Sequence, residues 1–82
     1  MNDIKYGMIE EIYFLDDIRR KTYGIAAYAN SEKDGTATVI AAINDICHDR
    51  SKLAEFVESC NRLELSLEHL YDAVDDFVAD EN

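Results

Sequence analysis

Apolar residues in the first half of the chain recur with the two-residue period of β-strands. Residues 22–29 show this period most clearly, because Tyr23, Ile25 and Ala27 fall on one face of an extended chain. Residues 8–15 are rich in apolar and β-favouring side chains, and residues 36–43 contain several β-branched ones. We therefore predict three strands, over residues 8–15, 22–29 and 36–43.

Polar stretches separate these strands. Residues 16–21 are polar and charged, and we predict that they form the first connection. Residues 30–35 gather turn-forming side chains and end in Asp34-Gly35, where glycine can take the positive φ that a hairpin turn requires. Connections this short cannot make parallel crossovers, so the strands are expected to form an antiparallel meander.

In the second half of the chain the apolar period changes to that of helices. Asp49 and Ser66 are the predicted N-caps. The two helices then run over about residues 50–62 and 67–79. The predicted apolar stripe of the first helix comprises Leu53, Phe56, Val57, Cys60 and Leu63, and that of the second comprises Leu67, Leu70, Tyr71, Val74, Phe77 and Val78.

These elements predict an α+β fold of βββαα type, in which a three-stranded antiparallel meander is followed by two helices packed on one of its faces. A chain of 82 residues has room for one core, so we expect residues 1–82 to form a single small domain. No apolar run approaches the roughly 18 residues of a membrane helix, and the first residues lack the pattern of a signal peptide. We therefore expect a cytoplasmic protein with no membrane partner, and we expect Cys47 and Cys60 to be free thiols.

Charge narrows the range of partners. The chain has 8 basic and 18 acidic residues, which gives a net charge of −10. A negative surface argues against direct binding to nucleic acid, and a basic protein is the expected partner. The negative charge is concentrated near the end of the chain, because no Lys or Arg follows Arg62.

Residues with catalytic or metal-binding chemistry are few. The soft metal ligands Cys47, His48, Cys60 and His69 do not form a pair at zinc-ligand spacing. A cysteine nucleophile would need a histidine base in the right geometry, which the adjacency of Cys47 and His48 does not supply. No glycine belongs to a phosphate-binding loop. We therefore expect no metal, no cofactor and no enzymatic activity.

Several short motifs resemble those of a known family. They are Asp45-Ile46-Cys47-His48-Asp49-Arg50, Cys60-Asn61, Leu65-Ser66 with His69-Leu70 and Asp72, and Asp75-Asp76-Phe77, together with the Tyr23-Gly24-Ile25 strand. From about residue 22 onward the chain is similar to a family of short uncharacterised proteins of Clostridia-type Firmicutes, a domain of unknown function. It differs from that pattern at Cys47, where serine is usual, and at Leu67, where proline is common. The resemblance implies a bacterial origin and supports the fold, and it implies no activity.

The outer face of the last helix is the candidate site. Its tentative partner-binding residues are Glu68, His69, Asp72, Asp75 and Asp76. Carboxylates near the C-terminal end of a helix are disfavoured by the helix dipole, so helix stability does not explain them, whereas solubility or a basic partner does. His69 has two interpretations: a partner contact or general base, or a ring that caps backbone N–H groups or pairs with Asp72.

Three hypotheses follow from different classes of function. The first is a small protein-binding or regulatory module that uses its acidic C-terminal helix or a sheet edge. The alternative is an acidic nucleic-acid mimic, such as a phage-type inhibitor of a nuclease or another nucleic-acid-binding protein, because acids at positions 68, 72, 76 and 80 recur about every 6 Å along a helix. The third, an enzyme, finds no support in the motifs. An edge strand would also allow a homodimer, and nothing in the sequence selects it over a monomer.

Overall fold

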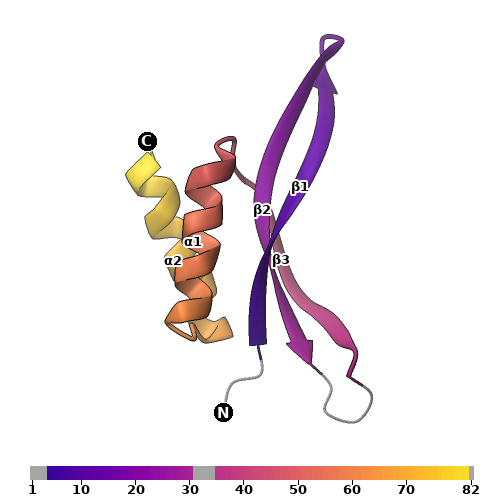
Figure 1. Ribbon diagram of the computed structural model, residues 1–82. Coiled ribbons are helices and arrows are strands. Elements are labelled where there is room, and N and C mark those ends of the chain that lie inside the picture. The colour runs from indigo at the N-terminus through magenta and orange to yellow at the C-terminus, as the bar shows by residue number, and fades with distance from the viewer. Residues whose placement is uncertain (1–3, 31–34, 82) are drawn as a thin grey trace.

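The computed structural model describes residues 4–30 and 35–81. Along the chain follow β1 (Ile4–Leu15), β2 (Ile18–Asn30), β3 (Ala37–Cys47), α1 (Arg50–Arg62) and α2 (Leu67–Glu81). The strands form one antiparallel sheet in the order β1-β2-β3, and both helices lie on the same side of it (Figure 1). The predicted α+β fold with βββαα order is confirmed.

The prediction that residues 16–21 form a connection is wrong. Only Asp16 and Asp17 form the turn, with φ values of 53° and 65°, and Leu15 already pairs with Ile18. Two central residues with positive φ are typical of a type I′ turn, whose twist suits a tight hairpin. The polar residues that follow the turn belong to β2, because neither face of this part of the ribbon is buried and polar side chains are tolerated there.

Two other predicted strand limits are too narrow. β1 begins at Ile4 and β3 continues to Cys47, across a bulge in which the residues between Ile43 and Cys47 face Gly24 alone. Gly24 permits this close approach, because a Cβ atom there would lie 2.2 Å from the backbone oxygen of Ile43. Of the predicted turn at 30–35, residues 31–34 lie outside the described part of the chain, and Gly35 has a φ of +70°.

Both ends of α1 have identifiable caps. The backbone N–H of Lys52 donates to Asp49 Oδ1 at 3.2 Å, which confirms Asp49 as the N-cap. At the other end Glu64 takes a φ of 50°, and the N–H of Leu65 donates to the carbonyl of Cys60 at 3.0 Å, which is a Schellman motif without its usual glycine. Leu63 belongs to this cap and is 72% exposed, so its predicted place in the apolar stripe is wrong.

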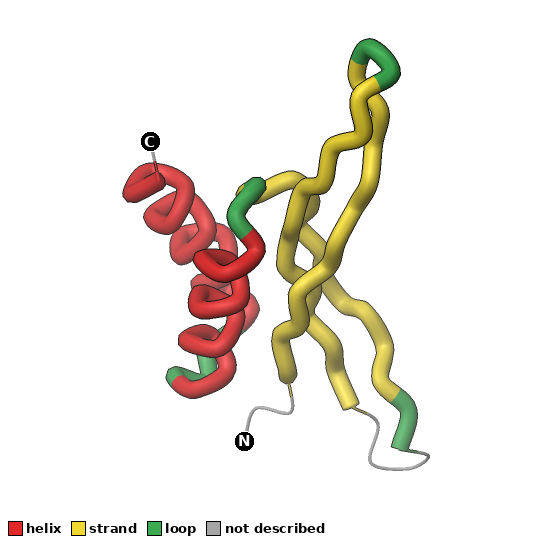
Figure 2. The backbone as a smooth tube through the Cα atoms, turned by 45° about the horizontal axis from the view of Figure 1, so that its top comes forward, coloured by secondary structure: helices red, strands yellow, loops and turns green. Residues whose placement is uncertain are grey.

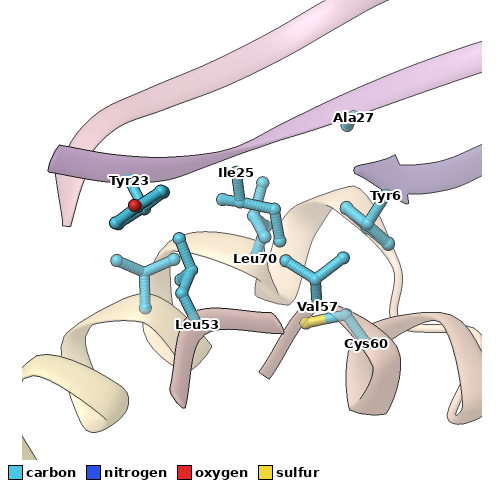
Figure 3. Packing of buried hydrophobic residues seen from close by; sticks show 9 residues of the cluster. Tyr6, Tyr23, Ile25, Ala27, Leu53, Val57, Cys60 and Leu70 are labelled. Atoms are coloured by element: carbon cyan, nitrogen blue, oxygen red, sulfur yellow. The ribbon is translucent and has the colours of Figure 1, made fainter. Parts of the chain in front are cut away.

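The core lies between the sheet and the helix layer (Figure 3). Its buried cluster consists of Tyr6, Tyr23, Ile25, Ala27, Leu53, Val57, Cys60, Leu70 and Val74. The predicted stripe of α2 is correct except for Tyr71, which is 57% exposed. Tyr71 stands at the rim of the stripe, whereas Leu70 and Val74 are at its centre and take the space against the sheet.

Asn61 at the end of α1 fastens the outer edge of β1. Its side-chain Nδ2 donates to the carbonyl of Tyr6 at 2.9 Å, and the N–H of Tyr6 donates to Asn61 Oδ1 at 2.8 Å. The Tyr6 hydroxyl also donates to the carbonyl of Leu65 at 2.7 Å. A side-chain amide thus pairs with β1 at this position as a further strand would, and it closes the edge of the sheet there.

Candidate functional site

The β1–β2 hairpin extends well beyond β3 and the helices (Figure 2). The pairing of β3 with β2 ends at Tyr23, whereas β1 and β2 pair as far as Leu15 and Ile18. Every residue from Glu10 to Lys21 is exposed. We call residues 10–21 the hairpin arm.

The hairpin arm exposes an unusual amount of apolar surface. It holds five of the nine large apolar side chains that are exposed in the described part of the chain, with exposed fractions between 38% and 71%. They are Ile12, Tyr13, Phe14, Leu15 and Ile18. Ile12 and Phe14 lie on one face of the ribbon, and Tyr13, Leu15 and Ile18 lie on the other. Isolated exposed apolar residues are normal on proteins, but a cluster of this kind at the end of one hairpin is typical of an interaction surface.

The hairpin arm also carries three of the chain's eight basic residues, beside the four acidic residues Glu10, Glu11, Asp16 and Asp17. Arg19, Arg20 and Lys21 follow each other on β2 and are all exposed. The ammonium of Lys21 lies 3.4 Å from a carboxylate oxygen of Glu10 on the neighbouring strand. Both side chains are about half exposed, so this pair contributes little to stability.

The predicted site on α2 lies on its solvent side. The exposed carboxylates there, which we call the acidic face, are Glu68, Asp72, Asp75, Asp76 and Asp80. None of them forms an ion pair with another residue in the described ranges, and the last turn of α2 contains no basic residue. The backbone alone brings these acids together, and their charges face water.

His69 lies beside the acidic face in the first turn of α2 and is exposed. Its backbone N–H donates to the carbonyl of Ser66 at 3.0 Å. Within residues 4–30 and 35–81 its ring pairs with neither Asp72 nor a backbone group. The interpretation of His69 as a cap or as a partner of Asp72 is therefore wrong for this structure, and the ring is open to solvent.

The two cysteines are free, as predicted, and Cys60 is in the core. Burial raises the pKa of the Cys60 thiol. Burial also raises the pKa of the Tyr6 phenol, with a further rise from the nearby Cys60. A buried thiol with a raised pKa is a poor nucleophile, so Cys60 acts as a packing residue.

The described surface offers few alternatives to these two regions. No pocket is found on it, and His, Cys, Asp and Glu side chains do not gather in threes at metal-binding distance among the described residues. Neither α1 nor α2, the helices of the described chain, has the length and apolar character needed to cross a membrane.

Comparison with known proteins places the chain in a family. A family model described as a family of unknown function (DUF6514) matches residues 2–80. The chain belongs to this family. The match includes β1, a segment in which the motifs showed little resemblance to the family. An origin in Clostridia-type Firmicutes stays a prediction. No curated protein and no solved structure matches the chain.

Several of the motif residues in this member of DUF6514 have structural roles. Asp45 takes a φ of 55° at the bulge and accepts a hydrogen bond of 2.6 Å from the hydroxyl of the buried Thr22. His48 Nδ1 lies 3.0 Å from the carbonyl of Lys21, at the corner where β3 leads into α1. Together with Asp49 and Asn61, these residues position the helices on the sheet. The acids of α2 make no comparable bond to the described residues.

The hairpin arm was missed in the prediction from sequence, although a signal for it exists. Residues 12–15 of this DUF6514 chain are four consecutive apolar residues, which place apolar side chains on both faces of a strand. A strand that is apolar on both faces must be covered by other elements on both faces, or one apolar face remains exposed. Two helices on one face cannot cover both sides, so the sequence already implied an exposed apolar surface.

Proposed function

We propose that this protein is a small non-enzymatic module that binds another protein through its hairpin arm. The observation that carries the proposal is the exposure of five neighbouring large apolar side chains beyond the core. Their combined exposed area is on the order of 500 Å², divided between the two faces of the ribbon, and apolar surface of this extent on a small soluble protein is often functional. An isolated two-stranded hairpin is only marginally stable in water, so a partner that covers the arm would also stabilise it.

The acidic face of α2 is the second candidate surface, and its partner would be a basic protein. Five exposed carboxylates without an ion pair among the described residues support it. Their spacing along the helix also supports the nucleic-acid mimic, because a basic groove that binds phosphates would accept a row of carboxylates. Binding through this face would weaken strongly as salt is added, whereas apolar binding through the arm would not.

The experiment is affinity capture from a lysate of the source organism with three immobilised chains. The first is the wild type, and the second is an arm variant with Ile12→Ser and Phe14→Ser. The third is an acidic-face variant with Glu68→Lys, Asp72→Lys and Asp76→Lys. We expect the arm variant to lose a protein that the wild type retains at high salt.

A matched control tests whether any loss of exposed apolar surface has the same effect. Val39→Ser with Leu63→Ser removes two side chains that are 55% and 72% exposed and lie outside the arm. This variant should retain the captured protein. If the arm variant captures the same proteins as the wild type, the face of the arm that carries Ile12 and Phe14 is not the binding surface. A loss with the acidic-face variant alone would favour the basic partner.

A further inference from the structure

The helix-bearing face of the sheet is about twice as long as the helix layer that covers it. β1 has 12 residues and is therefore about 40 Å long. α1 has 13 residues and is only about 20 Å long. The alternation that directs Tyr6 and Met8 to the core continues to Ile12 and Phe14, which therefore lie on the same face. The end of the β1–β2 hairpin extends beyond the helices (Figure 1). The arm extends a sheet surface that already binds helices.

Basic side chains share this uncovered face. Arg19 lies opposite Phe14 and Lys21 opposite Ile12 in the strand register, and opposite residues of an antiparallel pair are on one face. Lys21 pairs with Glu10, whereas Arg19 forms no ion pair with any residue that the structure describes. A helix that docks here should therefore present acidic residues beside an apolar or aromatic one.

The α2 helix of this chain has that combination on its exposed side. Tyr71 is 57% exposed and lies between Glu68, three residues before it, and Asp75, four residues after it. Residues at these spacings are neighbours on a helix surface. We propose that the hairpin arm docks onto α2 of a second copy of this chain, an inference that rests on the arm being the binding surface.

In a two-fold dimer, both the hairpin arm and α2 of each copy would contact the other copy. In a single copy the arm extends away from the helix layer, so its tip is far from the α2 of the same chain (Figures 1 and 2). In a two-fold dimer each contact occurs twice, because the arm of each copy meets the α2 of the other. A standard interface buries about 800 Å² on each partner, so each arm and each α2 would have to contribute about 400 Å².

The first test is the mass of the purified full-length chain in solution, measured by light scattering at concentrations from about 1 μM to about 500 μM. We expect the mass to rise from 9.4 kDa to twice that value. Phe14→Ser should raise the dissociation constant at least tenfold. Leu15→Ser is the matched control, because Leu15 is also exposed but points to the opposite face, and it should dimerise like the wild type.

Charge reversal tests whether α2 is the surface that the arm meets. Arg19→Glu alone, and Glu68→Arg with Asp75→Arg in another chain, should each prevent dimerisation, because like charges then meet at both contacts. A mixture of the two variants should form a one-to-one dimer, because each arm then meets opposite charge on the other chain. Arg20→Glu reverses a charge on the opposite face and should dimerise normally. If the mixture stays monomeric, the proposed docking onto α2 is refuted.

Other outcomes separate this inference from the proposed function. A wild type that remains monomeric at all concentrations refutes the second copy as partner, and the binding function survives if the arm still captures a foreign protein. A monomeric wild type whose arm captures nothing refutes both proposals. If the wild type dimerises no more tightly than Phe14→Ser, the arm is not part of the dimer contact.

Discussion

Replacing Asn61 by alanine tests how strongly the edge of β1 depends on α1. The substitution removes the two hydrogen bonds of 2.8 and 2.9 Å that join the side-chain amide to the backbone of Tyr6. Each bond contributes about 1 kcal/mol net, and a buried backbone group left without a partner costs about 1 to 3 kcal/mol. Tyr6 is only 5% exposed, but Asn61 itself borders solvent, so water can replace part of the loss. We expect the free energy of unfolding to fall by about 2 to 3 kcal/mol.

A loss of this size is a large part of the stability of so small a domain, which is of the order of 4 to 12 kcal/mol. Urea unfolding followed by circular dichroism and by tyrosine fluorescence measures it, because the chain has five tyrosines and no tryptophan. With a slope of about 1 kcal/mol per molar urea, the midpoint should fall by about 2 to 3 M.

Asn30→Ala serves as the control for Asn61→Ala, because Asn30 is exposed at the end of β2. It should change the stability by less than about 0.5 kcal/mol. If the two variants unfold at the same urea concentration, the amide of Asn61 does not hold β1, and the reasoning is refuted.

Three further predictions follow from backbone geometry and burial. Glu64→Gly should stabilise the protein by about 1 kcal/mol, because glycine adopts the φ of 50° without a Cβ clash. The midpoint of thermal unfolding should then rise by about 4 to 8 °C. An unchanged midpoint would show that the backbone at this cap is not strained. Gly24→Ala should destabilise the fold by more than about 2 kcal/mol, because the new Cβ would lie 2.2 Å from the backbone oxygen of Ile43. A urea midpoint equal to that of the wild type would contradict this close approach at the bulge. Folding raises the pKa values of Cys60 and Tyr6. These two groups should therefore leave the free energy of unfolding unchanged below the ordinary thiol pKa of 9.0 and lower it as the pH rises above that value, because the unfolded chain loses its protons first. Urea midpoints at pH 8 and at pH 10.5 check this, and a rise at the higher pH would reverse the assigned sign.

Local sequence patterns were sufficient for the core of the fold. Tyr23, Ile25 and Ala27 were assigned to one face of a strand by their alternation, and all three are buried. Asp49 was assigned as an N-cap from its residue type and position, and its carboxylate does cap α1. Both signals depend on neighbours in the chain, so a single sequence is enough to detect them.

The errors arose where exposure depended on distant segments. Residues 18–21 look like a loop because three of the four are charged, and they form a strand because their partners on β1 extend equally far. Leu63 and Tyr71 have the spacing of core residues, but each lies at the rim of a helix face, where the sheet no longer covers it. The candidate site was predicted in part: the acids of α2 are exposed, as the helical angles indicated, whereas the hairpin arm was not recognised.

By itself, the sequence determined the type and order of the elements, the face that residues 22–29 and the two helices turn to the core, and the acidic character of α2. These properties follow from the residue period and the capping residues, which act within a few positions of the chain. Only the tertiary structure decided which parts of those faces are covered. The outer edge of β1 is closed at Tyr6 because Asn61, in the last turn of α1, lies beside it. The hairpin arm is open because a strand of 12 residues is about twice as long as a helix of 13.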